Sequence, residues 1–179
     1  GLDLLFATAV SQSLGEGVAT LPFLGPYIVA PTAIKYGASD NQKEKLFADM
    51  CENLINFGIG FSEYFGSRDS SGLNISDNKV TGKTLFVLDT DFASHVMIAD
   101  NKGQIGIVSL DSNGIETIDL TTVDKTRTYK EMHFSDTPIE ILDKTKSSSF
   151  AVEMALDAGR IIAAADSLGA SQAMINKAV

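Results

Sequence analysis

Residues 58–69, Gly58-Ile59-Gly60-Phe61-Ser62-Glu63-Tyr64-Phe65-Gly66-Ser67-Arg68-Asp69, mark the point at which the hydrophobic pattern of this sequence changes. Before this stretch, apolar residues recur at helical spacing. After it, they fall into short runs separated by turn residues, which is typical of strands. A helical pattern returns after residue 147. The order of helices, strands and a final helix predicts an α+β fold with the sheet in the middle.

The sequence ahead of residue 58 predicts three helices. The first spans residues 2–14 and is ended by Gly15 and Gly17. The second runs from Tyr27 to Tyr36, with Pro31 in its first turn or at its start.

The third helix is predicted over 40–54 from the clearest local signal in the chain. Ser39 and Gln42 have the spacing of a capping box, in which each side chain bonds to the backbone of the other residue. Cys51 lies beside the apolar edge of this helix and is expected to be a small buried side chain. That edge is formed by Leu46, Met50 and Leu54.

Short strand-like runs follow, separated by turn residues. They include residues 80–87, 95–99, 105–110, 115–120 and 131–134. Asn113-Gly114 is the strongest hairpin turn signal in the chain. The regular spacing of the strands favours a small antiparallel barrel or sandwich over a parallel sheet with crossover helices.

The last helical segment is predicted to begin after a serine cap within residues 147–149 and to run towards residue 179. A long helix cannot bury its apolar stripe alone, so this one needs partner helices. We therefore divide the chain into a partial helical domain over 1–56, a β-barrel over 57–143 and the start of a second helical domain over 148–179.

Composition narrows the classes of partner and site. The net charge of −9 disfavours nucleic acid and anionic membrane surfaces, since both need a cationic protein face. A single cysteine cannot form an internal disulfide, and a cytoplasmic location is the simplest interpretation. The only histidines, His95 and His133, have no third ligand at a recognisable spacing, so no metal site is expected.

Several short motifs of the sequence occur in the same order as in a known family. Ser62-Glu63-Tyr64 and Ser67-Arg68-Asp69 stand where that family has Thr-Glu-Pro and Gly-Ser-Asp, and Phe86-Val87-Leu88 stands where it has Trp-Ile-Thr. A later run, residues 131–138, is similar to the family's exit from its barrel, and residues 160–173 are similar to its next helix. The chain thus resembles the acyl-CoA dehydrogenase family, although each motif taken alone is degenerate.

The resemblance implies a fold and a chemistry. The fold is an N-terminal helical part, an antiparallel β-barrel and the first C-terminal helix. The implied chemistry is FAD-dependent oxidation of an acyl thioester at Cα–Cβ, with acyl-CoA as substrate, an electron-transfer flavoprotein or similar acceptor, and a homo-oligomeric assembly. Arg68 is expected at the substrate. The residues expected at the cofactor are Phe61, Ser62, Ser67, Phe86, Val87 and Leu88.

Departures from the family pattern leave a second interpretation open. Leu88 lacks the hydroxyl that supports the flavin's reactive nitrogen, and Arg68 replaces a serine at the cofactor and substrate wall. Gly159 stands at one family position of the catalytic base, so no base is assigned. The alternative is a non-catalytic scaffold or partner subunit that has lost flavin. A plain β-barrel binding module with helical flanks, unrelated to the family, is a third possibility.

Overall fold

The computed structural model describes residues 3–179 and confirms the predicted α+β class. Helix α1 spans Leu4–Glu16 with Asp3 as its N-cap, and residue 2 of the predicted helix lies outside the described part. Gly17 is the C-cap, as predicted. Gly15 is within the helix, so the prediction that it ends α1 is wrong; it is a packing residue instead.

Two helices follow where they were expected, with shifted bounds. A π-helical turn, η1 (Gly25–Val29), leads into α2 (Ala30–Gly37), and α3 spans Asp40–Cys51. The predicted capping box at the start of α3 is present. Two expectations at its end are wrong: Leu54 lies beyond the helix and is 61% exposed, and Cys51 in the last turn is exposed. The helix stops before Leu54, so Leu54 does not continue the apolar edge, whereas Met50 still packs against the core.

The middle of the chain forms one eight-stranded sheet. The main path of the sheet has the order β6-β7-β3-β1-β4-β5-β8, and β2 pairs with β3 beside this path. All pairs are antiparallel except β1 with β4, which is parallel. The bounds are β1 Phe57–Gly60, β2 Gly72–Ser76, β3 Lys79–Leu88, β4 His95–Ala99, β5 Ile105–Ser109, β6 Ile115–Leu120, β7 Tyr129–Pro138 and β8 Glu140–Ile141, with short 3-10 helices η2 at Ser62–Phe65 and η3 at Asp143–Lys146.

The expected hairpin at Asn113-Gly114 is not formed. The strands on either side of this turn pair elsewhere, β5 with β4 and β8, and β6 with β7. Gly114 has φ +84°, and its carbonyl accepts hydrogen bonds from the Ser135 amide and the Thr137 hydroxyl. The turn therefore carries the chain between two parts of the sheet.

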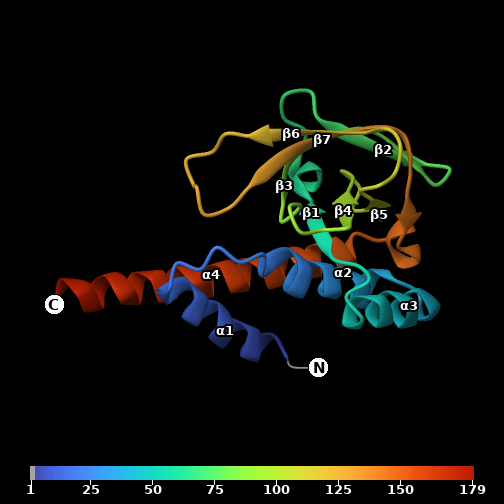
Figure 1. The fold of residues 1–179 in the computed structure, drawn as a ribbon. Coiled ribbons are helices and arrows are strands. Elements are labelled where there is room, and N and C mark those ends of the chain that lie inside the picture. Colours follow the sequence, from blue (N-terminus) through green and yellow to red (C-terminus); the bar gives the residue numbers. More distant parts are fainter. Residues whose placement is uncertain (1–2) are drawn as a thin grey trace.

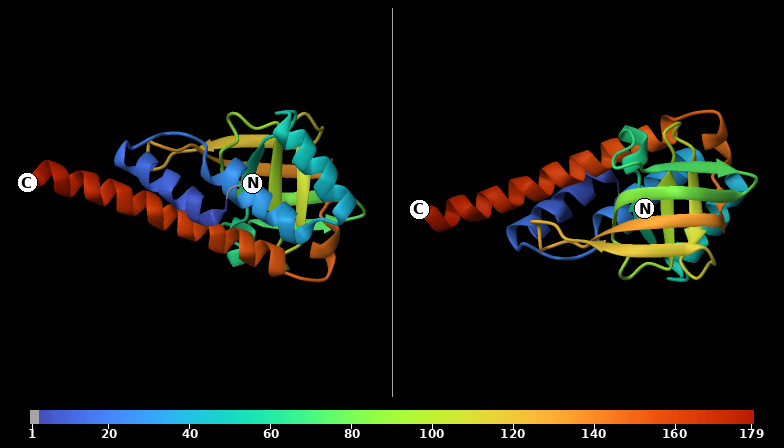
Figure 2. Two further views of the ribbon diagram at one scale, coloured as in Figure 1. Left: turned by 90° about the horizontal axis from the view of Figure 1, so that it is seen from below. Right: turned by 90° about the horizontal axis from the view of Figure 1, so that it is seen from above.

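Helix α4, Phe150–Ala178, confirms the predicted C-terminal helix. The helices gather on one side of the curved sheet, and the last part of α4 extends beyond it in every view (Figures 1 and 2). Helix α1 lies directly against α4: a Cβ on Gly15 would overlap the carbonyl of Asp166, and one on Gly169 would overlap that of Gln12. No helix in residues 3–179 has the length and apolar character needed to cross a membrane.

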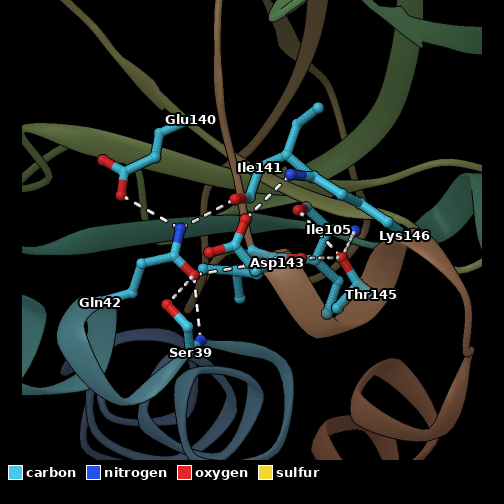
Figure 3. A network of polar contacts seen from close by, with 9 residues as sticks. Ser39, Gln42, Ile105, Glu140, Ile141, Asp143, Thr145 and Lys146 are labelled. Atoms are coloured by element: carbon cyan, nitrogen blue, oxygen red, sulfur yellow. Dashed lines mark hydrogen bonds and ion pairs between the residues drawn. The ribbon is translucent and has the colours of Figure 1, made fainter.

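Two main hydrophobic clusters place the sheet relative to the helices. One fills the space between sheet and helices and contains residues from both, such as Ile34, Phe57 and Val152; the other fills the inside of the curved sheet. Gln42 connects the helices to the sheet through hydrogen bonds (Figure 3). Its Oε1 accepts from the backbone amides of Ser39 and Asp143, and its Nε2 donates to the Ile141 carbonyl. One capping-box residue thus also fixes α3 to the far edge of the sheet.

Candidate functional site

Strands β1 and β3 bring together the two sequence motifs expected at the cofactor, residues 62–64 and residues 86–88. Ile59 pairs with Leu88 across the two strands. Just beyond the end of β1, the Ser62 hydroxyl donates to the Leu85 carbonyl at 2.6 Å. The predicted residues Ser62 and Phe86 therefore lie close together where the chain leaves the end of β1 beside β3. We call this place the rim and define it as residues 61–62 and 85–88.

Phe86 stands at an irregularity of the rim. The register between β3 and β7 shifts between Thr84 and Val87, so that Phe86 occupies a bulge. Its φ is +54°, a region that bulky side chains rarely adopt. The ring is 42% exposed and meets Tyr129 edge-on, with 6.5 Å between centroids. Backbone strain of this kind concentrates at functional sites, and at the rim it accompanies an aromatic ring that is turned outwards.

Two other predicted cofactor residues face the interior. Phe61 is 4% exposed and packs in the cluster between sheet and helices, whereas Val87 is fully buried inside the sheet. Their side chains are unavailable to a ligand. Any contribution they make to binding comes from their backbone groups.

Ser67 and Arg68 lie on the loop that leaves η2, and both are exposed. The Arg68 amide donates to the Ser71 hydroxyl at 2.9 Å, and the Ser71 amide donates back to the Arg68 carbonyl, which closes a tight turn. Arg68 forms no ion pair among residues 3–179. The structure thus leaves the guanidinium at the surface and does not place it against the rim.

Leu88 ends β3 and faces a cavity of about 220 Å³ between the sheet and the α1–α4 pair. Tyr129, the partner of Phe86, lines the same cavity. Its walls are mainly apolar, and its polar groups include Arg127 and Asp166. The other named wall residues are Ser11, Leu14, Ala19, Leu21, Phe23, Leu24, Ile162, Ala163 and Ser167. An apolar space therefore begins next to the rim and runs between the helices.

Helix α4 holds η2 through two contacts on one helix face. The Tyr64 hydroxyl donates to Glu153 at 2.8 Å, and Arg160 lies 5.6 Å from the centre of the Phe65 ring. The hydrogen bond from Ser149, together with that from Tyr64, lowers the pKa of Glu153, and the bond to Glu153 raises the pKa of Tyr64. Tyr64 stands where the resembling family has proline, so this attachment follows from a departure from the pattern.

Sequence reasoning missed two residues that contact the rim. Tyr129 supports Phe86, and Glu63 is a carboxylate only 1% exposed that accepts a hydrogen bond from Ser71 at 2.7 Å. A glutamate close to apolar residues at a strand end was the available signal for Glu63. For Tyr129 there was no signal, since its position depends on the register of β7 against β3.

Neither Gly159 nor the histidines add a catalytic or metal-binding group to the rim. Gly159 supplies no side chain, and it is buried where a Cβ would meet Val29 at 3.3 Å, a closer contact than usual. Within residues 3–179, no group of three or more His, Cys, Asp or Glu side chains is arranged to hold a metal ion.

Known proteins share this geometry at the level of the fold. No protein-family model and no curated protein matches the sequence. Solved structures do match. A glutaryl-coenzyme A dehydrogenase in complex with glutaryl-CoA aligns with TM-score 0.80 and 16% identity over 98% of this chain and 50% of its own. The chain has an acyl-CoA dehydrogenase fold.

Two further dehydrogenase structures also align with this chain. Butyryl-CoA dehydrogenase from Megasphaera elsdenii aligns with TM-score 0.79 and 18% identity, covering 97% of this chain and 51% of that one. Acyl-CoA dehydrogenase from Geobacillus kaustophilus aligns with TM-score 0.78 and 17% identity, covering 98% and 52%. The chain spans about half the length of these acyl-CoA dehydrogenases. The resemblance inferred from sequence is thereby confirmed for the fold.

Proposed function

We propose that this chain is part of an FAD-dependent acyl-CoA dehydrogenase-like protein that oxidises an acyl thioester between Cα and Cβ. The observation that carries the proposal is the meeting of Ser62 with the bulged segment of β3 at one rim. In a protein with this fold, Ser62 of the first predicted flavin-binding motif donates a hydrogen bond to Leu85, the residue just before the second motif at residues 86–88.

The rim residues fit a flavin. An isoalloxazine ring needs an aromatic or apolar surface and polar partners for its edge. Phe86, supported by Tyr129, supplies an outward aromatic surface, and Ser62 with the backbone of residues 85–88 supplies polar groups. Bound FAD would supply the acceptor for the hydride that leaves Cβ.

The chain's own residues would then bind and orient the substrate. The apolar cavity beside Leu88 would receive the acyl chain and keep water from it. The exposed guanidinium of Arg68 would be free to meet a phosphate of the acyl carrier. An electron-transfer flavoprotein or similar acceptor and a homo-oligomer belong to the same proposal. Because Gly159 leaves no base, we expect this chain alone to be inactive in acyl-CoA oxidation.

A flavin titration tests the proposal. Purified chain is added to FAD while flavin fluorescence is followed, with Ser62→Ala and Phe86→Ala as site variants and Phe150→Ala, at the start of α4, as an exposed aromatic control. Saturable binding that both site variants weaken and the control leaves unchanged supports the proposal. Absence of binding, or equal binding by all variants, contradicts it.

The second candidate is a flavin-free scaffold or partner subunit with the same fold. Leu88 favours it, because the rim lacks a hydroxyl donor there. Tyr64 also favours it, because this residue stands where the family has proline and, together with Phe65, attaches η2 to α4. Leu88→Thr separates the two candidates. The change restores a hydroxyl at the rim and should tighten FAD binding if the rim is a flavin site, whereas a protein that stays flavin-free supports the scaffold.

A further inference from the structure

Glu63 is a buried carboxylate with no cationic partner. It is 1% exposed, follows Ser62 directly, and forms no ion pair among the residues that the structure describes. Removing a carboxylate from water is costly unless hydrogen-bond donors replace the lost hydration. The donors around Glu63 therefore indicate what the residue does.

Those donors come from three separate segments. The Ser71 hydroxyl donates to Oε2 at 2.7 Å, the Ser62 hydroxyl lies 3.2 Å from Oε1, and the Leu85 amide lies 3.4 Å from Oε1. Ser62 belongs to η2, Ser71 to the loop after it, and Leu85 to β3. A single side chain thus connects every segment that carries a predicted site residue.

This arrangement fixes the orientation of the Ser62 hydroxyl. A serine hydroxyl has one proton to donate and two lone pairs that accept. The Leu85 carbonyl, 2.6 Å from the Ser62 hydroxyl, takes that proton, since Glu63 Oε1 lies farther away at 3.2 Å. Ser62 can therefore offer a ligand only its lone pairs. Ser71 in turn accepts from the Arg68 amide, so Glu63 also holds the loop of Ser67 and Arg68.

We infer that Glu63 is a positioning residue, whose carboxylate fixes loop 66–71 and the Leu85 amide beside the rim. The Leu85 carbonyl in turn keeps Ser62 as a hydrogen-bond acceptor. The inference rests on the proposed flavin site and adds to it the group that orients that site. It also predicts which flavin group bonds to Ser62. Ser62 should accept a hydrogen bond from an N–H of the flavin edge and should not bond to a flavin carbonyl.

Glu63→Gln tests this role because it keeps the shape and replaces one acceptor oxygen by an NH₂ donor. We expect faster hydrogen exchange at the Arg68 and Leu85 amides in flavin-free protein, and an FAD dissociation constant raised roughly tenfold or more. The unfolding temperature should stay near that of the unaltered chain, because the substitution also removes a buried charge. Glu131→Gln is the matched control: it removes a carboxylate bonded to His133 on the same sheet, and should change neither readout.

The outcomes separate this inference from the proposed function. Unchanged exchange at Arg68 and Leu85 in folded Glu63→Gln protein overturns the inference, as does an unchanged FAD dissociation constant. If Glu63→Gln does not fold, Ser71→Ala removes the closest donor to Glu63 and should speed exchange at the Leu85 amide, which bonds to Glu63 and not to Ser71; unchanged exchange there overturns the inference. If the unaltered chain binds no FAD, the proposed function fails, and exchange in the flavin-free protein still decides whether Glu63 holds the loop.

Discussion

Two glycines determine the α1–α4 interface, whereas one strained aromatic residue shapes the rim of β1 and β3. At the interface, Gly15 and Gly169 let two helix backbones touch, and neither position has space for a methyl group. At the rim, Phe86 adopts a positive φ and keeps its ring partly in solvent. The first arrangement contributes to stability, and the second lowers it. Close packing is thus concentrated between the helices, while backbone strain is tolerated where a ligand is proposed to bind.

The largest expected effect is at the interface. Gly169→Ala should lower the free energy of unfolding by about 3 kcal/mol, because the new methyl group overlaps the Gln12 carbonyl and forces the helices apart. Urea unfolding followed by circular dichroism measures it. Gly17→Ala is the control, since a Cβ there meets only ordinary contacts, the nearest at 3.7 Å. Equal stability of the two variants would show that the helices do not touch as described.

A substitution at the rim should change the free energy of unfolding much less. Phe86→Gly removes the unfavourable φ, worth roughly 1–2 kcal/mol, and loses the contact with Tyr129, worth roughly 0.5–1.5 kcal/mol. We expect the free energy of unfolding to stay within about 1 kcal/mol of the unaltered chain, while FAD affinity falls. A large loss of stability would mean that Phe86 is a core residue and that the contrast between the regions is wrong.

The attachment of η2 to α4 links the two regions and should be weaker still. Tyr64→Phe removes the hydrogen bond to Glu153 and should lower the free energy of unfolding by about 0.5 kcal/mol, since the bond is exposed to solvent. Its clearer signature is the pKa of Glu153, which the Tyr64 bond helps to lower and which should rise in the variant. Carboxyl-resolved NMR titration measures the shift, and an unchanged pKa would show that the bond is absent in solution.

The smallest effect concerns His95, which lies outside both regions and faces Lys45, Asp49, Asp111 and Glu140. Burial lowers the pKa of His95, so the unfolded chain takes up a proton more readily than the folded one. Stability should therefore fall as the pH drops through the ordinary histidine pKa of about 6.5 and towards the lowered pKa of the folded state. His95→Gln should reduce this slope. Equal slopes in the unaltered chain and the variant would show that burial of His95 does not cause the pH dependence.

Local signals made much of the fold predictable. The capping box of Ser39 and Gln42 located α3, and helical spacing located α4, because both depend on residues close in sequence. The parallel pairing of β1 with β4 and the missing hairpin at Asn113-Gly114 depend on which distant strands meet. Turn residues show where a chain reverses, but they do not select its partner strand.

The proximity of the two segments of the candidate site was predictable from the sequence, but the orientation and burial of their side chains were not. Sequence order placed Ser62 and the Phe86–Leu88 segment together, and the structure brings them to one rim. It did not reveal that Val87 faces the interior, that Phe86 stands on a bulge, or that Glu63 is buried. These features depend on a register shift between β3 and β7 and on contacts among three segments, which no local pattern encodes.

Hydrogen exchange with and without FAD tests the central claim, that the rim is a flavin site, most directly. We predict that saturating FAD slows exchange at residues 61–62 and 85–88 and leaves the α1–α4 contact around Gly15 and Gly169 unchanged. Protection confined to the helices, or no protection at the rim at an FAD concentration that saturates the protein, would contradict the claim.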